Sequence, residues 1–550
     1  MHKQKTNQGI TLIALVITII VLLILAGISI SMAIGQNGIV TQAQNAVSSH
    51  DSATEAEQIK LATANAMIKA LTGESSDKLA TILGELDAEK IKDVKNSGNT
   101  ARISYGDNEY IVDLANGNVA PVTEDKWDGT SMSEGLVGEG TDAKPYLIRS
   151  GADLKYLGEQ MGKDQAIVGL NEDGTPNGCN AHSTFAIYKV TNDISLENHE
   201  FLPLGMSIEN GSIRRSSFFG KFDGDNHKIS NIKIDIDTID VGFFTIAWKT
   251  TIKNLILDNV DIKGAGNVGG LVGHISSDET TTVIQNCHVS GKIASEKFLN
   301  TSINLYFMKS WQVGGLVGDL CTPTTIENCT TNVEIKGNAM VGGIVGQAEN
   351  YRGNVPDEDK YGAQIINCVA NGKIEADSDY GGLVGKAGGV CIKNSVSNME
   401  IKSVAKPVPT DSRDGVKTMY VGGLVGYIST EFKMENSYST GAIIMDRPVE
   451  YIGSIVGWMQ TGKILNCHNT GAITCANTVD RLGGLVGSGL CSPTNCILTN
   501  VYNSGNVTVD TTKLGTKVGK ICGKKDGSGE FTAQGCSVIG SFPVNQDYGN

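Results

Sequence analysis

The stretch Gly269-Gly270-Leu271-Val272-Gly273 decides the fold of this chain, because it recurs through the C-terminal half of the sequence. The first glycines of successive copies are 45, 28, 39, 41, 31, 30 and 36 residues apart. We interpret the shortest interval as the basic unit and the longer ones as that unit with loop insertions. The copies, named glycine boxes here, begin and end at Gly269 and Gly273, Gly314 and Gly318, Gly342 and Gly346, Gly381 and Gly385, Gly422 and Gly426, Gly453 and Gly457, Gly483 and Gly487, and, in a degenerate form, Gly519 and Gly523.

A second element, an apolar residue followed by any residue, Asn and then Cys or Ser, lies between the boxes. Short β-rich segments separated by Gly and Asn turns can wind into a coil whose strands stack in parallel. The asparagines would then align in a ladder, because stacked amides hydrogen-bond along the axis and Asn tolerates turn conformations. The predicted ladder residues are Asn254, Asn286, Asn328, Asn367, Asn394, Asn436, Asn466 and Asn500.

The 12 cysteines follow this repeat instead of the paired spacing of a metal site. Cys287, Cys329, Cys368 and Cys467 each follow a ladder Asn, so we interpret them as small buried residues. Cys491 and Cys496 bracket a short turn and could form a local disulfide.

The repeated boxes resemble the GLUG motif of bacterial surface proteins. The resemblance extends upstream to the stretch from Phe219 to Ile229, and it covers roughly residues 127–540. It implies a mostly β chain that forms a right-handed parallel β-helix with a surface, often adhesive, role. We therefore expect an opening segment with the first rungs over 127–240, the repeat solenoid over 241–540 and a C-terminal tail over 541–550.

The N-terminus combines a polar stretch, Met1 to Gly9, with an apolar run from Ile10 to Ile34. This run is long enough to span a bilayer, and the lysines before it favour a cytoplasmic N-terminus. Gly9 before the apolar run resembles the leader of type IV prepilins. That resemblance implies cleavage by prepilin peptidase after Gly9 and methylation of Ile10. Ala14 stands where the family usually has Glu, which favours a minor or tip subunit over a shaft subunit, and a plain membrane anchor is the alternative.

We expect three N-terminal segments, a leader over 1–9, a transmembrane helix over 10–37 and a small pilin-like α+β stem over 38–126. The stem prediction rests on alanines and Ile59 that recur at helical spacing between residues 40 and 71. Two alternating segments around Gly106 and Asp107 then predict a β-hairpin.

No catalytic, cofactor or metal motif stands out in the sequence. GLUG boxes also accompany some immunoglobulin A1 metallopeptidases, but the two-His-plus-Glu helix motif of zinc peptidases is absent. Asp235, Asp237 and Asp240 could hold calcium, although a strand with one solvated face explains them more simply. The formal net charge of -14 excludes an electrostatic nucleic-acid binder.

The sequence thus favours a non-enzymatic, membrane-anchored surface protein, with pilin subunits and a host or cell-wall glycan or protein as partners. The alternatives are an anchored solenoid outside any filament and a β-helix polysaccharide lyase or hydrolase. The predicted insertions, 294–312, 347–363 and 402–420, contain aromatic residues that could bind sugars or a protein, or could cap the flank of the solenoid. These residues are Tyr306, Trp311, Tyr351, Tyr361 and Tyr420.

Overall fold

The computed structural model divides between Val122 and Thr123 into two compact units. The predicted leader and transmembrane helix, with Gly9, Ile10 and Ala14, lie outside the described residues. No helix in the described part of the chain is both long and apolar enough to span a membrane. The structure describes residues 50–96, 100–106, 108–163, 182–276, 281–295, 312–349, 361–403, 419–492 and 494–549.

The N-terminal unit is a small α+β fold, as the sequence predicted. Helices α3 (His50–Thr72) and α4 (Lys78–Glu85) contact each other, and their buried residues share one core with an antiparallel sheet in the order β1-β2-β3-β4. The predicted hairpin is confirmed, because Tyr105 at the end of one strand pairs with Asn108 at the start of the next. The four strands are β1 (Ile91–Asn96), β2 (Thr100–Tyr105), β3 (Asn108–Asp113) and β4 (Val119–Pro121).

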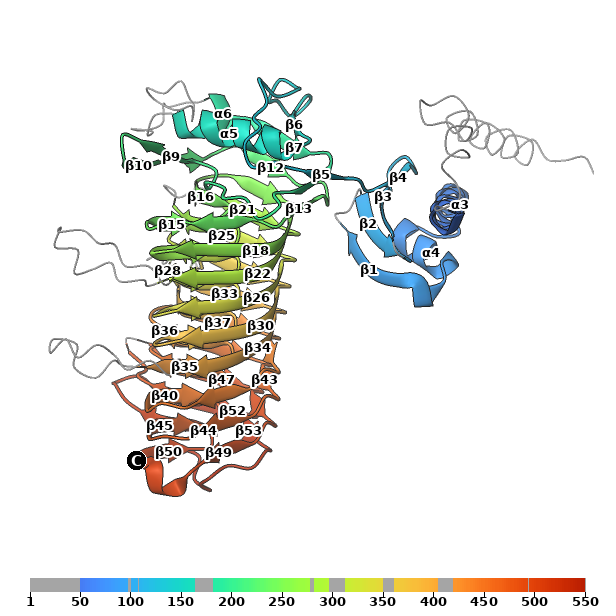
Figure 1. Ribbon diagram of the computed structural model, residues 1–550. Helices are drawn as coiled ribbons and strands as arrows, with labels where there is room; N and C mark the ends of the chain where they lie inside the picture. The colour runs from blue at the N-terminus through green and yellow to red at the C-terminus, as the bar shows by residue number, and fades with distance from the viewer. Residues whose placement is uncertain are drawn as a thin grey trace, which may run out of the picture. The chain divides into compact units, whose positions relative to one another are not determined.

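The second unit is a parallel β-solenoid whose coils stack along one axis (Figure 1). Its described coils contribute strands to four sheets, and some coils contribute two short strands to the fourth, such as β38 (Tyr438–Ser439) and β39 (Ile443–Met445). One coil runs through β19 (Gly266–Gly269), β20 (Val272–Ile275), β21 (Thr282–Gln285) and β22 (His288–Ser295). The next coil starts at β23 (Val313–Gly314), which pairs in parallel with β19. The prediction of a mostly β, parallel solenoid is confirmed, and its right-handedness stays a prediction.

Four sheets of 9, 10, 12 and 16 strands run along the solenoid. The third sheet extends from β6 (Tyr146–Ile148) to β52 (Phe531–Gln534), and the fourth from β5 (Glu124–Lys126) to β53 (Ser537–Val538). The first sheet contains β15 (Ile239–Val241), β19, β23, β27 (Val341–Gly342), β31 (Tyr380–Gly381), β35 (Tyr420–Gly422), β40 (Val449–Gly453), β45 (Val479–Gly483) and β50 (Leu514–Gly519). The second contains β11 (Ser217–Phe218), β16 (Phe244–Ala247), β20, β24 (Val317–Leu320), β28 (Val345–Glu349), β32 (Val384–Gly388), β36 (Val425–Ile428), β41 (Val456–Met459), β46 (Val486–Gly489) and β51 (Cys522–Lys525).

The glycine boxes form the corner between the first and second sheets, where the backbones of neighbouring coils approach closely. A Cβ atom on Gly269 would lie 2.7 Å from the backbone nitrogen of Gly318 in the next coil. A Cβ atom on Gly273 would lie 2.5 Å from the backbone nitrogen of Val241 in the preceding coil. The Leu271 side chain between them is fully buried. The first and last glycines are therefore needed because a side chain at either position would collide with an adjacent coil.

The predicted asparagine ladder lies at the turn between the third and fourth sheets, and side-chain hydrogen bonds join its residues at every step except that between Asn286 and Asn328. Every ladder residue has a left-handed φ between 50° and 54°, a conformation that Asn tolerates better than most residues. Asn286 Nδ2 donates to Asn254 Oδ1 at 3.0 Å, so the amides link adjacent coils. Equivalent bonds of 3.1–3.3 Å run from Asn367 to Asn328, Asn394 to Asn367, Asn436 to Asn394, Asn466 to Asn436 and Asn500 to Asn466.

The cysteines that follow a ladder Asn are buried, as predicted, and so are Ser395 and Ser437, which take the same place after Asn394 and Asn436. The side chain donates to the carbonyl two residues earlier, at 3.2 Å from Cys329 Sγ to Glu327 and at 2.8 Å from Ser395 Oγ to Lys393. Both residue types fit because the position needs a small side chain with one donor. Burial raises the pKa of the Cys467 thiol to about 12, so it stays protonated and inert. The other predicted positions, Cys287, Cys329 and Cys368, are equally buried.

Other groups of residues close the two ends of the solenoid. Helix α5 (Gly151–Lys163) buries Leu154, Leu157 and Met161 against the first coils. The solenoid begins at β5, a few residues before the predicted start at residue 127, because β5 pairs in parallel with β8 (Asp193–Ser195). At the other end, Tyr548 forms a parallel bridge with Cys522, so the predicted tail continues the stacking.

The glycine corner makes a direct stability prediction. A Cβ atom on Gly342 would lie 2.7 Å from the Leu383 carbonyl oxygen, so Gly342→Ala should destabilise the solenoid by about 2 kcal/mol through overpacking. Gly135→Ala is the control, because a Cβ atom there would meet nothing within 4 Å. Thermal melting of the full chain, followed by circular dichroism, measures both. Equal melting temperatures for the two variants would contradict the close-approach explanation.

Candidate ligand-binding surface

An aromatic cluster lies on the outer face of the first and second sheets. Tyr427 and Trp458 are register partners on β36 and β41, and Tyr420 and Tyr451 are partners on β35 and β40. Strand alternation explains the outward position of Tyr420, Tyr427 and Trp458, because the residues on either side of each are buried, as Gly426 and Ile428 are beside Tyr427. The four rings are half-buried and form what we name the aromatic patch.

The rings of the patch lie in mutual contact. The ring centres of Tyr427 and Trp458 are 4.8 Å apart, as are those of Tyr420 and Tyr451. Tyr420 and Tyr427, which belong to different sheets, stack at 5.0 Å with an angle of 19° between the ring planes. These contacts hold the rings in place, so a ligand would meet an ordered surface and little side-chain entropy would be lost on binding.

Basic side chains border the patch, and acidic residues pair with them. The Arg481 guanidinium lies 4.2 Å from the centre of the Tyr451 ring and its Nη1 is 3.2 Å from Glu450 Oε1. Lys386 Nζ lies 5.6 Å from the centre of the Tyr427 ring and 2.9 Å from Glu349 Oε1. The border therefore carries cation–π contacts and compensated charges.

Burial keeps the tyrosines of the patch neutral. It raises the pKa of Tyr451 to about 12 and also raises the pKa values of Tyr420 and Tyr427. The phenol groups consequently remain hydroxyls that can donate and accept hydrogen bonds at physiological pH.

Asp379 adjoins the patch through Tyr420 and has an unusual electrostatic state. Burial raises the pKa of its carboxyl group to about 6, although Ser378 Oγ donates to Asp379 Oδ1 at 2.8 Å. Its backbone is left-handed, with a φ of 53°. The carboxylate is therefore ionised near pH 7 at a cost to the folded state.

A second aromatic row lies on the fourth sheet. Tyr438, His468 and Tyr502 are register partners on β38 (Tyr438–Ser439), β43 (His468–Asn469) and β48 (Tyr502–Asn503). Adjacent ring centres are 4.9 and 4.8 Å apart and the planes are within 9° of parallel. These rings cover each other's faces, so the row presents mainly ring edges to a ligand.

The sequence analysis identified only part of this surface. Tyr420 belongs to the patch, whereas Tyr361 lies at a strand bridge in another part of the solenoid. Tyr306, Trp311 and Tyr351 lie outside the described residues.

Tyr427, Tyr451, Trp458 and Arg481 were missed. The available signal was their constant place relative to the glycine boxes, since Tyr427 and Trp458 each directly follow a closing glycine.

Two other predicted features also have a definite place in the structure. The acidic run is a strand with a solvated face, because Asp235 is exposed beside the buried Ile234. Asp240 is buried and accepts hydrogen bonds from Arg215 and Asn267.

The local disulfide considered for Cys491 and Cys496 is not formed in the structure, where both residues carry free thiols.

Comparison with known proteins supports the repeat assignment. The family model of the GLUG motif matches residues 264–294, 337–375 and 418–444, each of which spans one glycine box and part or all of the following turn. Halomucin of Haloquadratum walsbyi (strain DSM 16790 / HBSQ001) is 26% identical over 208 residues, which cover 38% of this chain and 2% of halomucin. Immunoglobulin A1 protease of Streptococcus sanguinis is 29% identical over 184 residues, which cover 29% of this chain and 9% of that protein. The chain thus spans only a small part of either relative.

Asp379 predicts a pH-dependent stability difference. Because its folded-state pKa lies above the ordinary value of 3.8, its contribution to stability is present below about pH 4 and is lost as pH rises through about 6. Asp379→Asn should therefore stabilise the chain at pH 7.5 by up to about 3 kcal/mol. That gain should shrink towards pH 3.5, which melting temperatures across this range would measure. A gain that does not change with pH would contradict the raised pKa.

Proposed function

We propose that this chain is a bacterial cell-surface protein whose β-solenoid binds a glycan through the aromatic patch. The observation that carries the proposal is the patch itself, in which Tyr420, Tyr427, Tyr451 and Trp458 are held outward on two adjoining sheets. The solenoid acts as a stiff scaffold that displays this surface, and no catalytic step is part of the proposal.

The surface location is supported by two features of the sequence. The GLUG matches relate the repeats to a motif of bacterial surface proteins, and the apolar run from Ile10 to Ile34 suits a membrane anchor. We propose that the N-terminus is processed between Gly9 and Ile10 as in prepilins, which makes the chain a minor or tip-type pilin-like protein. An anchored solenoid outside any filament is the alternative.

A glycan suits the patch because its rings are amphipathic and its border is polar. Tyrosine and tryptophan rings offer apolar faces and hydrogen-bonding groups together, which matches a molecule with both C–H and hydroxyl groups. Tyr, Trp and Arg are also enriched at the centres of protein interfaces, so a protein ligand is the alternative occupant of the patch. The net charge of -14 favours a neutral over an anionic glycan.

The lyase or hydrolase alternative receives less support from this surface. Such chemistry would need convergent carboxylates poised beside a basic residue. Three carboxylates that border the patch are instead engaged in ion pairs, Glu349 with Lys386, Glu450 with Arg481 and Asp480 with Lys517. The fourth, Asp379, accepts a hydrogen bond from Ser378 Oγ. This arrangement suits binding better than catalysis.

The patch predicts a binding loss that can be measured on a glycan array. The double variant Tyr427→Ala/Trp458→Ala should reduce binding of the detergent-solubilised full chain at least tenfold, because it removes the two partner rings on β36 and β41. Tyr438→Ala is the matched control, since Tyr438 is a half-buried aromatic residue on the fourth sheet. Unchanged binding by the double variant, or an array on which the wild-type chain binds nothing, would overturn the glycan proposal.

The N-terminal proposal is tested by mass spectrometry of the chain from a host with prepilin peptidase. We expect a mature chain that starts at N-methylated Ile10. Gly9→Val should block this cleavage, whereas Gln8→Ala should allow it. A wild-type chain that still starts at Met1 would leave an anchored solenoid and remove the pilin pathway.

A further inference from the structure

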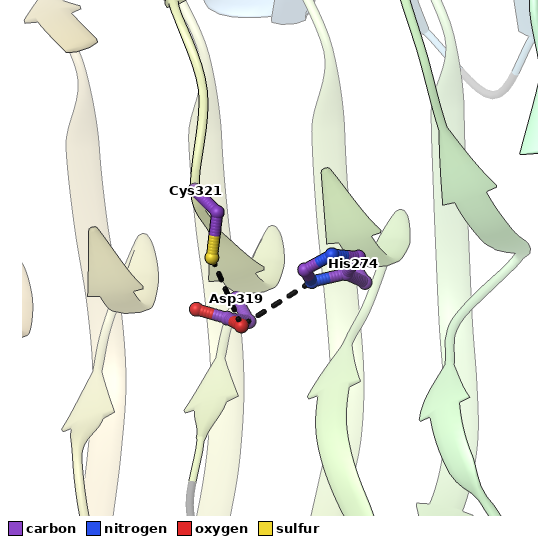
Figure 2. Close-up of side chains that lie close together, drawn as sticks. All are labelled: His274, Asp319 and Cys321. Carbon is purple, nitrogen blue, oxygen red and sulfur yellow. Dashed lines mark hydrogen bonds and ion pairs between the residues drawn. The ribbon is translucent and has the colours of Figure 1, made fainter. Parts of the chain in front are cut away.

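A cluster of three potential metal ligands lies on the second sheet, several coils from the aromatic patch. Figure 2 shows His274 and Asp319 on neighbouring strands, with Cys321 beside Asp319. His274 on β20 and Asp319 on β24 are register partners, so their side chains leave adjacent coils at the same level. Cys321 follows Asp319 by two residues, and the two-residue periodicity of an extended chain brings its sulfur to the same side.

The ligand atoms are close enough to share one ion. His274 Nδ1 lies 3.2 Å from Asp319 Oδ2, and Cys321 Sγ lies 3.4 Å from the same oxygen (Figure 2). All three atoms lie within 4.8 Å of one another. Ligands that bind zinc at 2.0–2.3 Å in a tetrahedron are separated by distances of this order.

The buried polar atoms of the cluster are incompletely satisfied by hydrogen bonds. Asp319 Oδ1 has no hydrogen-bond partner in the described structure, and His274 Nδ1 has only the neighbouring Asp319 Oδ2 at 3.2 Å. The Asp319 residue is only 7% exposed, so its carboxylate can recover little solvation from water. A buried polar atom without a partner costs free energy, and a metal ion bound between the two side chains would remove that cost.

The neighbouring charged groups are already engaged elsewhere. The Asp240 carboxylate accepts from Arg215 and from Asn267 Nδ2, the latter at 2.7 Å. Glu349 pairs with Lys386 at 2.9 Å. The cluster therefore offers three protein ligands, and the exposed side of Cys321 leaves a fourth position open to water.

We propose that His274, Asp319 and Cys321 form a zinc-binding site that links two adjacent coils of the solenoid. The donor set decides the metal, because an imidazole nitrogen with a thiolate sulfur favours zinc over calcium or magnesium, which prefer oxygen ligands. Three protein ligands with one open position are a recurrent zinc arrangement. This site is independent of the glycan proposal, since it shares no residue with the aromatic patch. The competing explanation of the cluster is an ion pair between protonated His274 and Asp319.

The experiment measures binding of Zn²⁺ and Co²⁺ to the full chain under reducing conditions. Equilibrium dialysis should give one tightly bound zinc ion per wild-type chain, with at least tenfold weaker binding in Cys321→Ser, His274→Ala and Asp319→Asn. Cobalt should produce a thiolate-to-metal charge-transfer absorption that disappears in Cys321→Ser. Zinc should also raise the melting temperature of the wild-type chain, because it binds only the folded state.

Cys536→Ser is the control, because it removes another incompletely buried thiol and should keep both the zinc ion and the cobalt band. Melting temperatures of the metal-free variants close to that of the wild type establish that the variants are folded. Zinc binding that is equally strong in Cys321→Ser, or a cobalt spectrum without thiolate character, would overturn the proposal. Absence of zinc binding by the wild-type chain would leave the ion pair as the explanation.

Discussion

The rest of this structure depends on the close approach of backbones at the glycine corner. Coils can stack at the strand spacing only if the chain turns between the first and second sheets without side chains in the way. Gly269 leaves room for the backbone of the following coil, and Gly273 leaves room for the backbone of the preceding coil. Because every box faces the same constraint, the repeat is visible in the sequence even where insertions stretch the interval between copies.

The interior of the solenoid could be predicted because its requirements recur in every coil. Each coil needs Gly at the corner, Asn in the left-handed turn and commonly a small hydrogen-bond donor after that Asn. These needs recur because the adjacent coils have the same backbone geometry. The outer face carries no such requirement. Trp458 and its register partner Ser488 both follow a closing glycine but have unrelated side chains, so this place in the repeat does not predict the residue type. Asp319 and His274 are likewise brought together by coil stacking across an insertion that hides their alignment.

This division also explains how one fold can carry different chemistry along its length. The column that contains His274 and Asp319 near one end of the second sheet continues to Lys386, Tyr427 and Trp458. Substitutions in this column leave the corner, the core and the ladder untouched. A polar metal-ligand cluster and an aromatic binding surface can therefore occupy different coils of one sheet without compromising either site.

The asparagine ladder has a consequence for the electrostatics of the whole solenoid. In each described link the amide of one coil donates to the coil before it, so the side-chain dipoles point the same way and reinforce one another. Each hydrogen-bonded segment of the column thus resembles a helix in having a positive end, and that of the first segment, formed by Asn286 and Asn254, lies at Asn254. There its Nδ2 donates at 2.9 Å to Oδ1 of Asp223, a carboxylate. A negative group at that end complements the summed dipole in the way that an acidic residue caps the N-terminus of an α-helix.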